Sequence, residues 1–125
     1  FEFFMATYDN LPVYKASYDL LVDLFRFTKE FTREYKYTLG ESIKKETVEM
    51  ITNIYRANST IARRKEKIAM ARENVETIRL FLRLLKDLQQ VGLKKFVALN
   101  ENLESVSKQL SAWYGSCGGE NSSRF

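Results

Sequence analysis

The sequence predicts an all-α protein, an antiparallel up-down-up-down four-helix bundle. The chain has 125 residues but only one proline and five glycines, so few residues interrupt helices. Apolar residues recur at steps of three and four in four separate segments, and this spacing is typical of amphipathic helices. The length fits one domain with a single core. No period-2 segment competes with this prediction.

The first predicted helix begins near Pro12, because proline is favoured at the first helical position. It carries two apolar stripes, and one of them should face the core: Val13, Leu20, Leu24, Phe27 and Phe31. The other should remain exposed on a monomer: Tyr14, Tyr18, Leu21 and Phe25. Exposed apolar patches of this size usually contact partners, so we expect the second stripe to form an oligomer interface. The alternative is that loops or the aromatic N-terminal residues cover it.

The second predicted helix runs from about Leu39 to Ser59. Thr38 is a plausible N-cap, and Glu41 three residues later would complete a capping box. Gly40 lies in the first turn, where its intrinsic penalty matters least.

The third predicted helix contains residues 65–86 and ends near Gly92, a glycine suited to positive φ at a helix C-terminus. Its apolar seam consists of Ile68, Val75, Ile78, Leu82 and Leu85, widened by Phe81, Leu84 and Leu88. The fourth helix carries Phe96, Leu99, Leu103, Val106, Leu110 and Trp113. We therefore expect a bundle over residues 11–114 between a flexible segment, residues 1–10, and a flexible tail, residues 115–125. Residues 1–4 precede Met5, a candidate natural start, and lie outside the predicted fold.

Positive charge is concentrated in one part of the chain. The net charge is +4 in total. Residues 61–96 hold ten Lys and Arg against four Asp and Glu, net +6, whereas residues 1–60 and 97–125 are each net −1. A basic segment in a near-neutral chain can attract phosphates. The alternative is an ordinary solvated helix face.

Within that segment, Lys65, Arg72, Arg79 and Lys86 recur every seven residues, with Arg83 beside them. A seven-residue step returns a helix to within about 20° of its starting direction, so these five cations form one row, called the basic row below. They are the candidate phosphate-binding residues. A second candidate group lies at the helix start: Arg63, Arg64, Lys65 and Lys67.

The composition argues against catalysis. The chain has no histidine, which removes the usual general base and the commonest metal ligand. A di-iron bundle would need Glu-x-x-His on two helices. Glu73 and Glu76 have ligand-like spacing but are better explained by ion pairs with neighbouring arginines, and Cys117 is an incidental thiol. We therefore expect no enzyme activity, no cofactor, no metal and no small-molecule substrate.

Cellular location follows from weaker signals. No apolar run approaches the roughly 18 residues that span a bilayer, and no signal peptide is visible. A single cysteine suits a reducing compartment. We expect a cytoplasmic protein without a membrane partner.

Five segments in order, LPVYKASYDLLVDLF, YKYTLGESI, NIYRANS, ETIRLFLRLLKDLQQVGLKKF and LSAWYG, resemble a family of four-helix-bundle proteins. That family contains proteins encoded in intervening sequences of large-subunit ribosomal RNA genes and the accessory variability determinant (Avd) of diversity-generating retroelements. The arginine-rich third helix and the Trp-containing end look closer to Avd. One departure is EFTREYKY in the first interhelix turn, where relatives often have proline.

The resemblance implies a homopentameric, basic barrel that associates with an error-prone reverse transcriptase and its template RNA or DNA during mutagenic copying. It supplies no catalytic residues. Mapped onto matching helix positions, its basic surface favours Arg72, Arg79, Arg83 and Lys86. The alternative is a structural homo-oligomer of the intervening-sequence type, with no nucleic-acid role.

Overall fold

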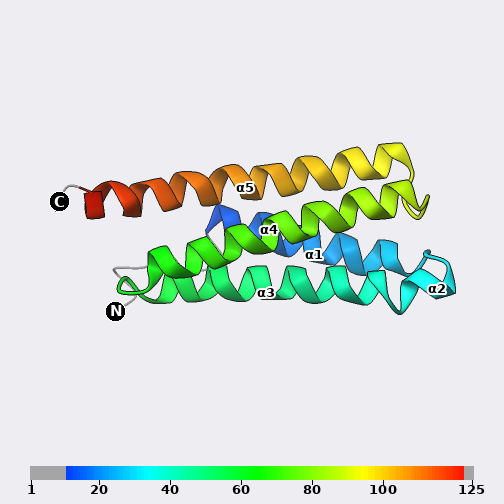
Figure 1. Ribbon diagram of the computed structural model, residues 1–125, viewed down its shortest axis with the longest axis horizontal. Helices are drawn as coiled ribbons and strands as arrows, with labels where there is room; N and C mark the ends of the chain where they lie inside the picture. The colour runs from blue at the N-terminus through cyan, green and yellow to red at the C-terminus, as the bar shows by residue number, and fades with distance from the viewer. Residues whose placement is uncertain (1–10, 123–125) are drawn as a thin grey trace.

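Four long helices run side by side in the computed structural model, which describes the backbone of residues 11–122 and the side chains of residues 11–117 (Figure 1). They are α1 (Pro12–Thr28), α3 (Leu39–Ser59), α4 (Arg64–Asp87) and α5 (Leu93–Ser122). Successive long helices run in opposite directions, and a four-residue helix, α2 (Arg33–Lys36), lies between α1 and α3. The predicted N-terminal segment, residues 1–10, lies outside the described residues.

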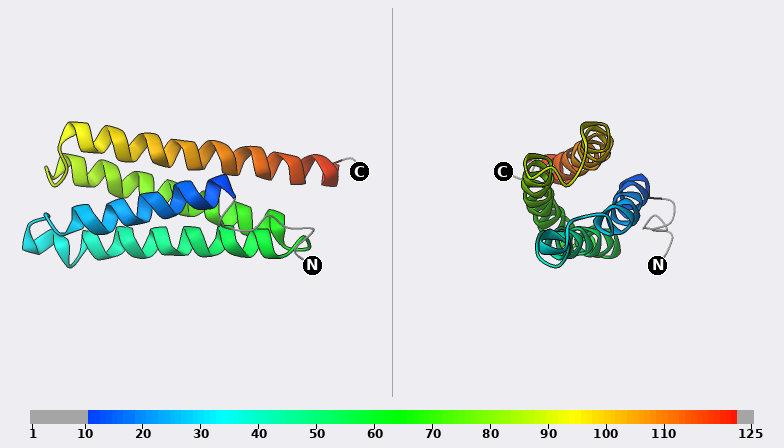
Figure 2. Two further views of the ribbon diagram at one scale, coloured as in Figure 1. Left: turned by 180° about the vertical axis from the view of Figure 1, so that it is seen from behind. Right: turned by 90° about the vertical axis from the view of Figure 1, so that its right-hand side faces the viewer.

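Seen end-on, the long helices stand at the corners of a square in the order α1, α3, α4, α5 (Figure 2). Each contacts the next, and α1 closes the square against α5. α1 and α4 therefore occupy opposite corners, and their outer faces point away from each other. This arrangement confirms the predicted four-helix bundle.

The inward stripe of α1 packs as its spacing predicts, with Val13, Leu20 and Leu24 buried and Phe27 partly buried. The first helix ends sooner than expected, at Thr28, so Phe31 reaches the core from the connection that follows α1. Leucine, isoleucine and valine from the other three helices complete the core. Leu84 differs from the prediction, because it lies on the outer face of α4 and is exposed.

The predicted capping box at the start of α3 is wrong. Thr38 precedes the helix with φ −116° and ψ −87° and forms no side-chain cap. Its hydroxyl instead donates to the Glu34 carbonyl at 2.7 Å, and Glu41 pairs with Lys44 at 2.8 Å. The short helix α2 explains the difference, because it places a carbonyl within reach four residues before Thr38.

Gly40 permits close packing at the same point. A Cβ atom on this residue would lie 3.2 Å from the Tyr35 carbonyl oxygen, tighter than an ordinary contact. Glycine therefore allows the first turn of α3 to pack directly against α2.

The prediction that the third long helix ends at a glycine is also wrong. α4 ends at Asp87, and the residue with positive φ is Gln89, at 59°. The Gln89 amide donates to the Lys86 carbonyl at 3.0 Å, and the Gln90 amide donates to the Leu85 carbonyl at 2.9 Å. These two bonds form a Schellman motif with glutamine in the left-handed position.

The last helix is longer than predicted, continuing to Ser122 instead of ending near Trp113. Trp113, Tyr114 and Cys117 all pack against the core, so apolar contacts extend beyond the predicted end. Glycine disfavours a helix by only about 1 kcal/mol, and the glycines of this segment do not end α5.

A polar network crosses the buried contact between α3 and α4. The Asn53 side-chain amide donates to Asn74 Oδ1 at 2.8 Å, and the Asn74 amide donates to Glu46 Oε2 at 2.6 Å. Both asparagines are buried. Because their amides must meet, the network fixes the axial register of α3 against α4.

Candidate nucleic-acid interface

The structure places the predicted basic row along the seam between α4 and α5. Lys65 Nζ lies 5.3 Å and Arg72 Cζ 4.8 Å from the centre of the Tyr114 ring. At the other end of the seam, Lys86 Nζ lies 5.2 Å from the centre of the Phe96 ring. The aromatic rings of α5 thus hold three cationic heads of α4 through cation–π contacts.

Arg79, at the centre of the row, is tied into ion pairs. Its Nη1 lies 2.6 Å from Glu76 Oε2, and its Nε and Nη2 lie 3.0 and 2.6 Å from Glu104 Oε2 on α5. The hydrogen bond to Glu76 is the largest cause that raises the pKa of Arg79, with Glu104 adding to it against partial burial. Arg79 therefore links α4 to α5 and has less capacity left for a phosphate.

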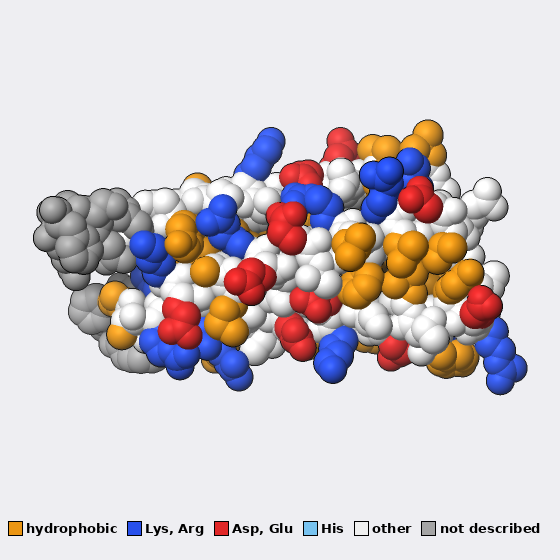
Figure 3. All heavy atoms as spheres, in the orientation of Figure 1, with side chains coloured by type: hydrophobic (Ala, Val, Ile, Leu, Met, Phe, Trp, Pro, Cys, Tyr) orange, Lys and Arg blue, Asp and Glu red, His pale blue; other side chains and the backbone are white. Residues whose placement is uncertain are grey.

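Arg83 lies beside the row with a side chain that is 72% exposed, 3.5 Å from Asp87. Arg72 is also exposed. These two arginines are the most accessible cations of the row. Figure 3 shows that basic and acidic side chains alternate over this face of the bundle.

The residues of the second predicted group, at the start of α4, make different contacts. Arg64 donates to the Ala57 carbonyl at 2.9 Å and the Asn58 carbonyl at 3.3 Å, and its guanidinium lies 5.8 Å from the Trp113 ring. It therefore caps the C-terminus of α3 and contacts Trp113 on α5. These contacts occupy Nε and Nη2 of Arg64 and leave fewer donors for a phosphate.

Arg63 and Lys67 line a surface cleft at this end of the bundle. Arg63 Nη2 lies 2.7 Å from Glu66 Oε2, and this hydrogen bond lowers the pKa of Glu66. Lys67 is buried, with its ammonium 3.8 Å from the Met70 sulfur.

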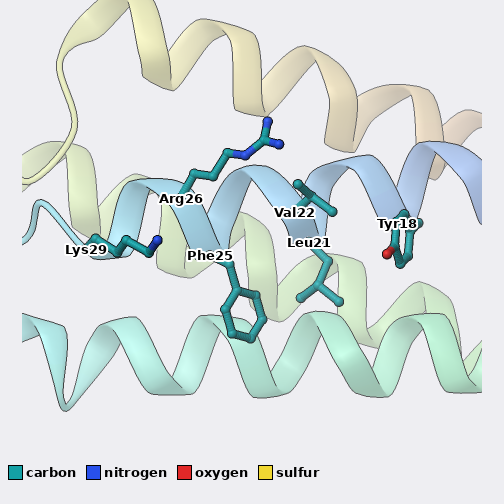
Figure 4. Close-up of a pocket in the computed structure, with 6 residues that line it drawn as sticks. All are labelled: Tyr18, Leu21, Val22, Phe25, Arg26 and Lys29. Carbon is teal, nitrogen blue, oxygen red and sulfur yellow. The ribbon is translucent and has the colours of Figure 1, made fainter.

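The outer face of α1 carries a shallow groove of about 410 Å³ (Figure 4). It contains three of the four predicted interface residues, and its lining consists of Tyr18, Leu21, Val22, Phe25, Arg26 and Lys29. Phe25 is 47% exposed. Tyr14, the fourth, instead packs partly against the core.

Sequence reasoning missed the α5 side chains that complete the row: Phe96, Glu104 and Tyr114. The helices α4 and α5 form an antiparallel hairpin whose turn is residues 88–92. In such a hairpin, residues at similar distances before and after the turn lie opposite each other. That rule brings Lys86 to Phe96 and Arg79 to Glu104. The signal was therefore present, although it required the two helices to be aligned with each other.

The sequence model of the bAvd-like family matches residues 13–117. The chain belongs to the bAvd-like family. The match includes the basic row, its α5 partners and the groove on α1. No curated protein sequence matches this bAvd-like chain.

A solved structure shares the bAvd-like fold described above. It is a protein of unknown function from the S23 ribosomal protein family of Bacteroides thetaiotaomicron, with a TM-score of 0.74 and 18% sequence identity. The alignment covers 82% of this chain and 97% of that one. At this identity the likeness supports the fold alone.

Two further properties bear on function. Within the part of the chain that the structure describes, no three His, Cys, Asp or Glu residues gather in a way that could hold a metal ion. None of the described helices combines the length and apolar character needed to cross a membrane.

Proposed function

We propose that this bAvd-like protein is a non-catalytic accessory subunit of a diversity-generating retroelement. It acts in the cytoplasm, where it binds the reverse transcriptase and the template RNA or DNA and supports mutagenic cDNA synthesis. The observation that carries the nucleic-acid role is the basic row, in which the Tyr114 and Phe96 rings hold the heads of Lys65, Arg72 and Lys86. Ordered cations at fixed spacing suit a phosphate backbone and carry no sequence preference.

The proposed assembly is a ring of identical subunits, five in number by resemblance. A closed ring requires two different contact surfaces on each subunit. Two exposed apolar patches lie at opposite corners of the square. One is the groove on α1, and the other is the outer face of α4, where Leu80 is 63% exposed and Leu84 is also exposed. These patches can serve as the two complementary faces.

We expect Phe25→Glu and Leu80→Glu each to convert the ring to smaller species, because either change places a charge in one of the two apolar contacts. Size-exclusion chromatography with light scattering measures the mass. Val48→Glu is the matched control, because Val48 is an exposed apolar residue on α3. Equal masses for all three variants would contradict this assembly.

We expect Arg72→Gln/Arg83→Gln to weaken binding to a structured RNA about tenfold at physiological salt. The slope of log affinity against log salt should become shallower by about 0.7–0.9 for each phosphate that the variant no longer neutralises. Fluorescence anisotropy across a salt series measures both quantities. Arg79 is left intact because its substitution would release Glu76 and Glu104 at the α4–α5 seam.

The matched control is Arg33→Gln/Lys45→Gln, which removes the same charge from exposed positions on α2 and α3. If both double variants weaken binding equally, net charge rather than the row attracts RNA. If the wild type itself shows no salt-sensitive binding, the nucleic-acid role fails.

The second candidate function is a structural homo-oligomer without a nucleic-acid role. A specific observation favours it, since Glu76, Asp87 and Glu104 partly neutralise the five cations of the row. This alternative keeps the ring and requires that RNA binding be absent at physiological salt.

A further inference from the structure

A second cleft lies at the end of the bundle where α3 turns into α4, at the lower left of Figure 1. Its volume is about 240 Å³, and its lining consists of Tyr55, Arg56, Ser59, Thr60, Arg63 and Lys67. The members of the basic row are not among these residues. The cleft is thus separate from the row on α4 and is called the turn cleft below.

The lining of the turn cleft is cationic. It combines two guanidinium groups, one ammonium group and three hydroxyl groups, and no carboxylate of the described residues lines it. Arginine presents a planar fork of donors that matches phosphate oxygens, while lysine adds a compact point charge. The chemistry therefore selects a phosphate group over a neutral or cationic ligand.

Lys67 is the strongest indication that a ligand is held here. It is only 7% exposed. Within the described part of the chain, its ammonium reaches the Met70 sulfur as a hydrogen-bond acceptor, at 3.8 Å. A thioether is a weak acceptor. The Lys67 ammonium therefore keeps donors that an oxygen acceptor can use, and a phosphate oxygen would supply that acceptor.

The two arginines of the turn cleft retain hydrogen-bond donors that a ligand can use. Among the described residues, Arg56 has no hydrogen-bond or ion-pair partner, and it is exposed. Arg63 uses Nε and Nη2 to reach Glu66, which leaves Nη1 for a ligand. The Ser59 hydroxyl already donates to the Tyr55 carbonyl at 2.9 Å, so Thr60 is the better hydroxyl donor.

The cleft is already shaped before a ligand arrives. Arg64 ties the start of α4 to the last carbonyls of α3 through its bonds to Ala57 and Asn58. These contacts fix the turn of residues 60–63 between the two helices. A preformed site loses less conformational entropy when it binds.

We propose that the turn cleft binds a phosphate group of a polynucleotide, with Arg56, Arg63 and Lys67 as the cationic ligands. Tyr55 also lines this cleft and is 48% exposed. The inference deepens the proposed function, on which it rests, by adding a second phosphate contact at the end of the bundle.

The test uses the full chain and two probes. Amide NMR spectra are recorded during titration with inorganic phosphate, and again with sodium chloride at equal ionic strength. We expect phosphate-specific shifts at residues 59–67. Arg56→Gln/Lys67→Met should raise the Kd for phosphate at least tenfold, because methionine fills the space of the buried lysine without its charge. Arg33→Gln/Lys45→Met is the matched control and should behave as the wild type.

The second probe, a structured RNA, distinguishes the sources of the phosphate. The Arg56/Lys67 variant should bind it about threefold to tenfold more weakly. Absence of phosphate-specific shifts in the wild type would overturn the site. Phosphate binding that the variant loses, with RNA affinity unchanged, would assign the cleft to a free phosphate and overturn the polynucleotide inference.

Failure of the basic row gives a different pattern. If the row is not an RNA surface, Arg72→Gln/Arg83→Gln leaves both RNA affinity and the phosphate shifts intact. The Arg56→Gln/Lys67→Met variant then still tests whether the turn cleft binds phosphate. The two proposals can therefore fail independently.

Discussion

Leu103→Ala is expected to lower the free energy of unfolding by about 2–5 kcal/mol. Leu103 is completely buried in the middle of α5, and alanine would leave a cavity that the surrounding helices can fill only in part. Glu104, its neighbour in sequence, carries the ion pair with Arg79. Loosening α5 should therefore also disturb the seam that orders the basic row.

Urea unfolding followed by circular dichroism measures the change, at one fixed protomer concentration because oligomers gain stability by mass action. Leu93→Ala is the matched control, since it makes the same substitution in the same helix at an exposed residue. It should alter stability by no more than about 0.5 kcal/mol. Equal losses in the two variants would show that burial of Leu103 is not what stabilises α5.

Asn74→Ala is expected to destabilise the bundle by about 1–3 kcal/mol. The change removes the acceptor of the Asn53 amide and the donor to Glu46 in one step. Asn53 is buried, so its amide would lose a hydrogen bond that water cannot easily replace. Glu46 is half-buried and can turn toward solvent, which limits the loss.

A double-mutant cycle with Asn53→Ala separates the network from simple truncation. The double variant should lose less stability than the sum of the two single variants, because each single change already breaks the amide–amide bond. Asn100→Ala, at a half-buried position on α5, is the control and should be nearly neutral. Strict additivity would contradict the network.

The sequence predicted the fold well where periodicity was long and uninterrupted. As expected, α1 begins at Pro12 and α3 runs from Leu39 to Ser59. The apolar positions of both segments repeat over several turns, which makes such helices easy to predict. Helix ends were harder to predict. The left-handed residue is Gln89 rather than Gly92, since the backbone bonds of the Schellman motif can hold a glutamine in a conformation that glycine adopts more readily.

The candidate site was predicted in part. Spacing alone aligned Lys65, Arg72, Arg79 and Lys86, and the structure keeps them on one seam. Their individual states depend on partners from other elements: Glu104 and Tyr114 on α5 for the row, and the carbonyls at the end of α3 for Arg64. The spacing of residues within one helix does not contain these pairings, which follow only when the helices are aligned with each other. The turn cleft was missed as a unit because Arg56 and Lys67 belong to different helices.

The short turns between consecutive helices have a kinetic consequence. α3, α4 and α5 are joined by residues 60–63 and 88–92, so most of the core forms between segments that are near neighbours in the chain. Helical proteins with such local contacts fold on the order of microseconds to milliseconds. The exception is the closure of α1 against α5, which brings together opposite ends of the chain. That closure carries the largest loop entropy cost, so we expect the contact between α1 and α5 to form last.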